Sequence, residues 1–151
     1  MCTRQAFPVW LLAGAMFDDV NVAAAVITLW RQHTPVTLLG QSSGPIRGKD
    51  GFLLQPDVTL AQMTCGTAAA SRLLLVAGGE ACAAALLLDP RVHQLVHRIL
   101  GQGGAVALMR GTRQVALETG LIQAHPTGLF LCQEKWMDAA AFVHHLITYL
   151  T

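Results

Sequence analysis

The chain has 151 residues, of which 53% are hydrophobic and 13% are charged, and its formal net charge at pH 7 is +1. This length fits one domain whose core needs no metal or disulfide, and we expect a single domain over residues 1–151. The basic residues are scattered, so we expect no nucleic-acid binding by this chain alone. No apolar run reaches the ~18 residues of a membrane-spanning helix, which predicts no membrane partner. The large apolar fraction indicates either a dense core or a surface that an oligomer buries.

The N-terminal segment has two interpretations. It could be a short signal peptide that ends near Gly14. We favour a buried first strand over residues 8–13, because the domain would otherwise lose the element that pairs with residues 36–39. The cysteines show no close spacing, and reduced thiols in a cytoplasmic protein are therefore expected. They are Cys2, Cys65, Cys82 and Cys132.

Short apolar runs alternate with helical patterns along the chain. Uninterrupted apolar runs predict strands over residues 8–13, 36–39, 72–77, 105–108 and 128–132. Apolar residues that recur every three or four positions predict helices over residues 18–32, 89–102, 112–119 and 137–150. Turn-forming residues 42–52 predict a small hairpin, and a short helical stretch follows Asp57. This order predicts an α/β fold, a flavodoxin-like three-layer sandwich with a mostly parallel sheet and helices on both faces.

Ligands in such sheets bind beyond the carboxyl ends of the strands. The strand ends at residues 14–19, 78–80 and 109–111 are therefore the candidate site. The predicted pocket residues are Asp18, Asp19, Asn21, Gly78, Gly79, Glu80, Met109 and Arg110. Arg110 could clamp a carboxylate or phosphate, or it could be a surface arginine in an ion pair. Glu80 and Glu134 could bring carboxylates to the pocket, or they could simply be solvated.

The elements that surround this site resemble a known family. Residues 104–111, with residues 118–122 after the next helix, resemble the nucleophile-elbow region of the ThiJ/PfpI family in the class I glutamine amidotransferase-like superfamily. Residues 72–79 are similar to the family strand that ends in paired glycines, where backbone amides form an oxyanion hole. Residues 44–47 and 51–57 are similar to the hairpin in the sensor-like domain that precedes a helix-turn-helix in some transcription regulators. Residues 128–132 resemble the family's last strand. The resemblance also implies a homodimer.

The chain departs from the family pattern at the residues that carry the family's catalytic chemistry. Family enzymes carry a cysteine at the elbow, whereas this chain has Met109, a thioether that cannot become a nucleophilic thiolate. The family's acidic residue falls at or near Asn21, with Asp18 and Asp19 slightly upstream. Relatives usually insert further strands where this chain passes from Ile122 to Gly128, and the pair His125-Pro126 is similar to the family's His-Pro pair.

These departures predict a non-catalytic domain that binds a small molecule or a partner at the degenerate elbow. There, Met109 either plugs the core or lines a pocket. One alternative is a cysteine-dependent hydrolase or lyase whose nucleophile has moved to Cys82; another is a structural homodimer. His93 and His97 have the i, i+4 spacing that can hold a metal on a helix, but no third ligand is indicated. We therefore expect no metal and no cofactor.

Overall fold

The computed structural model describes residues 8–65 and 71–150. Its main sheet has the strand order β5-β2-β1-β6-β7-β8, and every neighbouring pair is parallel. These strands are β1 (Val9–Ala13), β2 (Val36–Gly40), β5 (Val58–Thr59), β6 (Leu73–Val76), β7 (Ala105–Leu108) and β8 (Leu129–Cys132). A separate antiparallel hairpin consists of β3 (Ile46–Arg47) and β4 (Leu53–Leu54).

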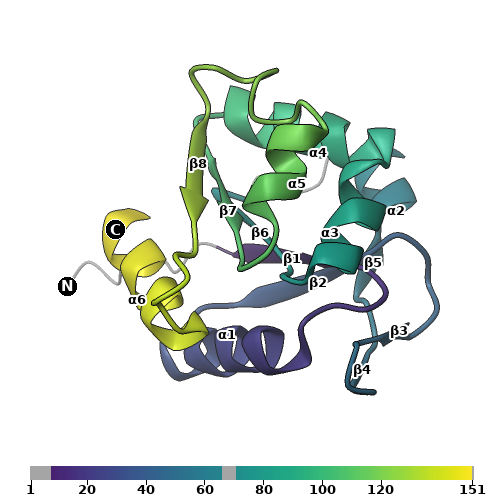
Figure 1. The fold of residues 1–151 in the computed structure, drawn as a ribbon, viewed down its shortest axis with the longest axis vertical. Helices are drawn as coiled ribbons and strands as arrows, with labels where there is room; N and C mark the ends of the chain where they lie inside the picture. The colour runs from purple at the N-terminus through teal and green to yellow at the C-terminus, as the bar shows by residue number, and fades with distance from the viewer. Residues whose placement is uncertain (1–7, 66–70, 151) are drawn as a thin grey trace.

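The helices cover both faces of this sheet (Figure 1). They are α1 (Asp19–Arg31), α2 (Leu60–Cys65), α3 (Glu80–Leu87), α4 (Pro90–Gly101), α5 (Arg113–Glu118) and α6 (Ala139–Leu150). Helices α1 and α6 pack together on one face, and α2, α3, α4 and α5 lie on the other. The predicted three-layer α/β architecture is therefore confirmed.

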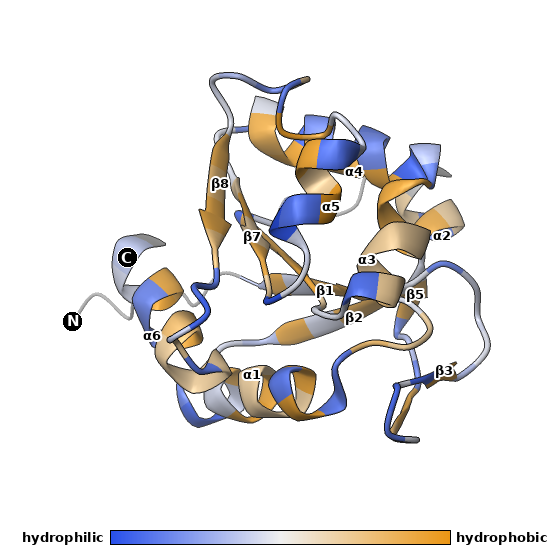
Figure 2. Ribbon diagram, viewed as in Figure 1, coloured by the Kyte–Doolittle hydropathy of each residue, from blue (hydrophilic) through white to orange (hydrophobic). Residues whose placement is uncertain are grey.

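The core lies around the central strands, because helices cover them on both faces. Every residue of β1, β6 and β7 is buried, and Figure 2 shows the apolar character of these strands. At the edge of the sheet, β8 is only half-buried along its length. None of the helices over the described residues is long and apolar enough to cross a membrane.

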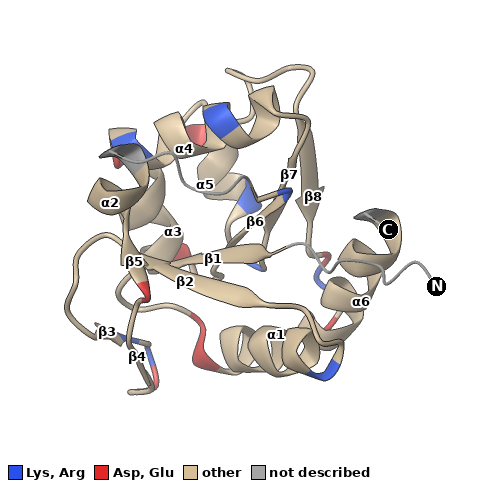
Figure 3. Ribbon diagram, turned by 180° about the vertical axis from the view of Figure 1, so that it is seen from behind, with Lys and Arg blue, Asp and Glu red and all other residues tan. Residues whose placement is uncertain are grey.

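Two elements had no bounds predicted from the sequence. Helix α3 follows the paired glycines directly, and the two-residue strand β5 pairs with the end of β2. The predicted pairing of the first two strands is confirmed, with Val9 opposite Val36. Figure 3 shows lysine and arginine residues at separate places on the fold rather than along one element.

Candidate functional site

The carboxyl ends of β1, β6 and β7 meet through backbone contacts. The Asp18 N–H donates to the Gly78 carbonyl over 2.9 Å, which joins the loop before α1 to the turn after β6. The Gly79 N–H donates to the Arg110 carbonyl over 3.1 Å, which joins that turn to the one after β7. Gly79 has a φ of 106°, a conformation that favours glycine. The fold thus brings together the three chain segments that the sequence predicted as neighbours.

The turn after β7 differs from a nucleophile elbow. The Thr112 N–H donates to the Met109 carbonyl over 3.1 Å, and Gly111, the third residue of this four-residue turn, has a φ of 86°. This is the pattern of a type II β-turn. Among described residues other than glycine, positive φ angles occur only at Met16 and His33. Met109 is thus free of the strain that exposes a nucleophile, and its side chain is 1% exposed within the apolar core.

The backbone amides beside the turn are already engaged. The Gly79 N–H is held by the Arg110 carbonyl, and the Arg110 N–H donates to the side-chain oxygen of Gln133 over 2.9 Å. Gln133 is itself buried, and its side-chain amide donates to the Met137 carbonyl over 3.0 Å. An oxyanion hole needs donors aimed at the reacting oxygen. In this structure the corresponding donors are satisfied within the protein.

The acidic residues before α1 have structural partners. The Asp18 carboxylate caps α1 by accepting from the Asn21 backbone N–H over 3.3 Å and from its side-chain amide over 2.9 Å. The Lys49 ammonium lies 3.8 Å from the same carboxylate. Asn21, at the position of the family's acid, therefore directs its amide toward Asp18.

Asp19 fixes the hairpin rather than lining an open pocket. Its buried carboxylate accepts from the backbone N–H groups of Asp50, over 3.1 Å, and Phe52, over 2.8 Å. Burial tends to raise the pKa of this carboxyl, but these hydrogen bonds and the nearby Lys49 outweigh it and lower the pKa. A Cβ atom at Gly48 would collide with the Asp19 carboxylate, so a glycine is required there.

Cys82 lies on the first turn of α3 and is fully buried. Burial raises the pKa of its thiol to about 11, although a hydrogen bond from the Gly14 backbone partly opposes the shift. At neutral pH the thiol is therefore protonated, which disfavours a nucleophilic role. Glu80 begins the same helix and is exposed.

The Cys132 thiol is also a poor nucleophile. Burial raises the pKa of the Cys132 thiol, an effect that Arg113 opposes and Glu134 reinforces. Cys132 is half-buried, because β8 is an edge strand. Cys2 lies outside the described residues, and the side chain of Cys65 is not described.

His125 and Pro126 lie far from the elbow. They precede β8, whereas Met109 follows β7. Because β7 and β8 are parallel, the two positions are at opposite ends of the sheet. The histidine that resembles the family's His-Pro pair is therefore separated from the turn that replaces the elbow.

An open groove of about 880 Å³ lies beside the turn, between α5 and the segment after β8. It is lined by Arg110, Gly111, Arg113, Gln114, Leu117, Gln133, Glu134, Lys135 and Trp136. The Arg110 guanidinium donates to the Met137 carbonyl over 2.7 Å, and the ion pairs found over residues 8–65 and 71–150 do not include it. The indole of Trp136 is 79% exposed.

The sequence identified Arg110 and Glu134 but missed Gln133, Lys135 and Trp136. Their position directly after β8, at the same edge of the sheet as the other strand ends, was the available signal.

The comparisons with known proteins agree with this fold. The model of the DJ-1/PfpI family matches residues 8–144, and the chain therefore belongs to that family. A search of curated proteins found no match.

Solved structures show the same fold at low sequence identity. Toxoplasma gondii DJ-1, in an oxidised form, matches with a TM-score of 0.78 and 14% identity over 96% of this chain and 91% of that one. Drosophila melanogaster DJ-1beta matches with a TM-score of 0.77 and 14% identity over 97% and 91%. A cysteine-to-alanine mutant of a DJ-1 superfamily protein from Salmonella typhimurium matches with a TM-score of 0.72 and 18% identity over 95% and 88%.

Proposed function

We propose that this chain is a non-catalytic DJ-1/PfpI domain that binds a small ligand in the groove beside Arg110. The observation that carries the proposal is the closed elbow. Met109 cannot ionise and is buried, and the neighbouring amides of Gly79 and Arg110 are bonded within the protein. The buried Cys82, with its raised pKa, is a poor substitute nucleophile.

The lining of the groove favours an anionic ligand that carries an aromatic ring. Arg110, Arg113 and Lys135 contribute three positive charges, against the single carboxylate of Glu134. Guanidinium groups bind carboxylate, sulfonate and phosphate oxygens through charge-assisted hydrogen bonds. The exposed indole of Trp136 offers a flat apolar surface on which a ring can stack.

An NMR titration with naphthalene-2-sulfonate tests this assignment. We expect the indole N–H signal of Trp136 to shift with saturation, because the sulfonate pairs with the arginines while the ring stacks. The Arg113→Gln variant should bind up to about fivefold more weakly. Arg47→Gln, which removes an exposed arginine on β3, is the matched control and should bind as the wild type does.

Two results would contradict the anion site. One is equal binding of the neutral naphthalene-2-sulfonamide, and the other is an unchanged affinity in Arg113→Gln.

The proposal that the chain is non-catalytic is tested separately, with hydrolysis of p-nitrophenyl acetate and hydration of an α-oxoaldehyde as assays. Wild type and Met109→Cys should both remain at the background rate, since a restored thiol would still face occupied amides and Asn21. Turnover that Cys82→Ala abolishes would instead support a relocated nucleophile.

We also propose that the chain forms a homodimer through α1. The exposed side of this helix carries Val20, Ile27 and Trp30, which are 72%, 43% and 63% exposed. Its other side packs into the core through Val22 and Leu29. A helix that is apolar on all sides is normally buried, and its sequence has no charge between its first and last residues. A second copy can cover this surface by pairing α1 with α1 around a two-fold axis.

Sedimentation equilibrium at tens of micromolar tests the dimer. We expect the wild type to sediment as a dimer and Trp30→Glu to dissociate at least about tenfold more readily, because the variant places a charge within the apolar contact. Leu88→Glu is the matched control, since Leu88 is 73% exposed but lies after α3. A monomeric wild type, or equal dissociation of both variants, would refute the α1 interface.

A further inference from the structure

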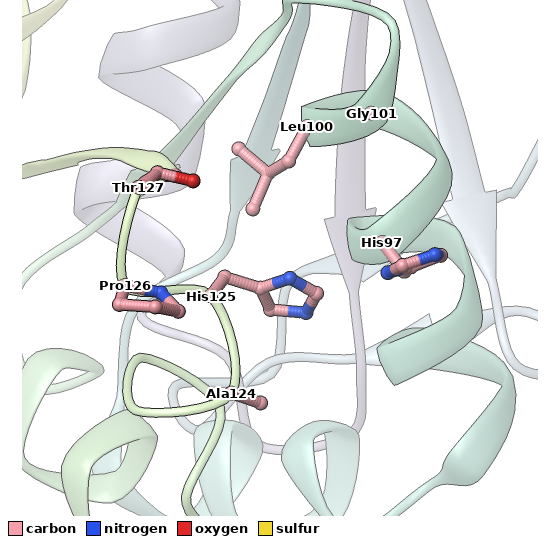
Figure 4. Close-up of a pocket in the computed structure, with 8 residues that line it drawn as sticks. His97, Leu100, Gly101, Ala124, His125, Pro126 and Thr127 are labelled. Carbon is pink, nitrogen blue, oxygen red and sulfur yellow. The ribbon is translucent and has the colours of Figure 1, made fainter.

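A histidine cluster lies at the amino end of the sheet, away from the groove. His93 and His97 stand one turn apart on α4, and His125 belongs to the segment that leads into β8. The rings of His97 and His125 have centroids 5.5 Å apart and are tilted by 41°. In Figure 4 the His125 ring is directed across a small pocket toward His97. The pocket, of about 240 Å³, is lined by both histidines together with Leu100 and residues 124–128.

The spacing of the two rings suits a shared metal ion. Two imidazole nitrogens bound to one ion at about 2.0–2.1 Å in tetrahedral geometry place their ring centroids roughly 5 Å apart. We propose that His97 and His125 bind a divalent first-row transition cation, such as Zn²⁺, Ni²⁺ or Cu²⁺, and so link α4 to the edge of the sheet. Neither the closed elbow nor the groove beside Arg110 contributes to this site.

The backbone holds His125 in place for this role. The His125 N–H donates to the Ile122 carbonyl over 3.1 Å, and the Gly128 N–H donates to the His125 carbonyl over 3.0 Å. Pro126 is the second residue of the resulting turn, where its fixed φ is favourable. A Cβ atom at Gly128 would lie 2.8 Å from a Leu100 methyl, so this glycine lets the segment approach α4 closely. A metal ligand on such a segment needs little reorganisation.

The electrostatics also favour a neutral, ligating His125. Burial lowers the pKa of its imidazole, and the neighbouring His97 and His93 lower it further. The lowered pKa favours the unprotonated ring, which is the form that binds metals. The ring of Phe130 also lies near His125, with centroids 6.5 Å apart.

The described residues provide two protein ligands, fewer than the three or four of a complete protein metal site. No group of three histidine, cysteine, aspartate or glutamate side chains within residues 8–65 and 71–150 is placed to hold a metal ion. His93 is close, but its Nε2–H donates to the Leu87 carbonyl over 2.6 Å. Water must then complete the coordination, and the order of affinities should follow Cu²⁺ above Ni²⁺ and Zn²⁺.

Metal titration of the untagged full chain with alkylated thiols tests the site. We expect one Cu²⁺, Ni²⁺ or Zn²⁺ per chain at neutral pH, measured by calorimetry. Paramagnetic Ni²⁺ should broaden NMR signals of residues 97–101 and 124–128 selectively. His97→Gln and His125→Gln should each weaken metal binding at least about tenfold. Even mutation of a residue that only hydrogen-bonds to a metal ligand typically lowers metal affinity ~10–100-fold. His145→Gln, an exposed histidine on α6, is the matched control.

Two further measurements separate this site from general histidine binding. Acidification should release the metal, because protons compete with a metal ion for its imidazole ligands. His93→Gln should change the affinity less than either ligand variant, because His93 is held by Leu87. Equal binding by wild type and the double variant His97→Gln/His125→Gln, or broadening that is spread over α6 as well, would overturn the proposal.

Discussion

Gly78→Ala is expected to destabilise the folded chain by about 2–4 kcal/mol. A Cβ atom at this position would lie 2.7 Å from the Arg110 carbonyl oxygen and 3.3 Å from the Met109 Cβ. The strand end cannot move away easily, because the Gly78 carbonyl accepts from Asp18 and the next amide donates to Arg110. The substitution therefore forces apart the turns after β6 and β7. Reversible urea unfolding, followed by far-UV circular dichroism, measures the change in the free energy of unfolding.

Gly101→Ala is the matched control for this experiment. Gly101 ends α4, and a Cβ atom there would meet no heavy atom within 4 Å. Alanine is the better helix former, so this variant should be neutral or more stable by up to about 1 kcal/mol. Equal stability of Gly78→Ala and the wild type would mean that the turns after β6 and β7 are not in close contact.

The sequence predicted the central strands well because of their environment. Strands β1, β6 and β7 are buried on both faces and are apolar at every position. An uninterrupted apolar run is typical of strands in a parallel sheet that helices cover on both faces. Helix α3 was missed for the opposite reason. Its sequence is mostly alanine and leucine, so no polar face reveals a helical period.

The proximity of the strand ends was predictable from the sequence, but the hydrogen bonds between them were not. Chain order and strand ends were enough to place Gly78, Gly79, Met109 and Arg110 together. The partners of Asp19 are backbone groups of the hairpin formed by β3 and β4. They depend on how that hairpin packs against the start of α1, which no local sequence pattern predicts. The same holds for Gln133, because an amide side chain after a strand does not reveal which backbone group it will satisfy.

The closed elbow depends on contacts that reinforce one another. Met109 fills the core, the β-turn directs its side chain inward, and Gln133 and Arg110 occupy the amides that surround it. Loss of the thiol alone would leave a strained turn and two free donors. Here, Met109 has no positive φ and the Gly79 and Arg110 amides are paired, so a cysteine substituted for Met109 would still meet paired amides.

Gln133→Leu is expected to destabilise the fold by about 1–3 kcal/mol. Leucine keeps a side chain of similar size in this buried position, so the change removes hydrogen bonds with little loss of packing. The Arg110 N–H loses its acceptor, while the Met137 carbonyl retains the Arg110 guanidinium as a donor. The cost therefore arises mainly from one unsatisfied amide at the elbow. Urea unfolding measures it, and amide hydrogen exchange should show faster exchange at Arg110 in particular.

Gln133→Glu separates the two hydrogen bonds of this side chain. A carboxylate can still accept from the Arg110 N–H, but it cannot donate to the Met137 carbonyl. We therefore expect Arg110 to keep slow amide exchange in Gln133→Glu and to lose it in Gln133→Leu. If leucine leaves both the stability and the exchange rate of Arg110 unchanged, the amide has another acceptor, and the elbow is held closed by the burial of Met109 and the β-turn alone.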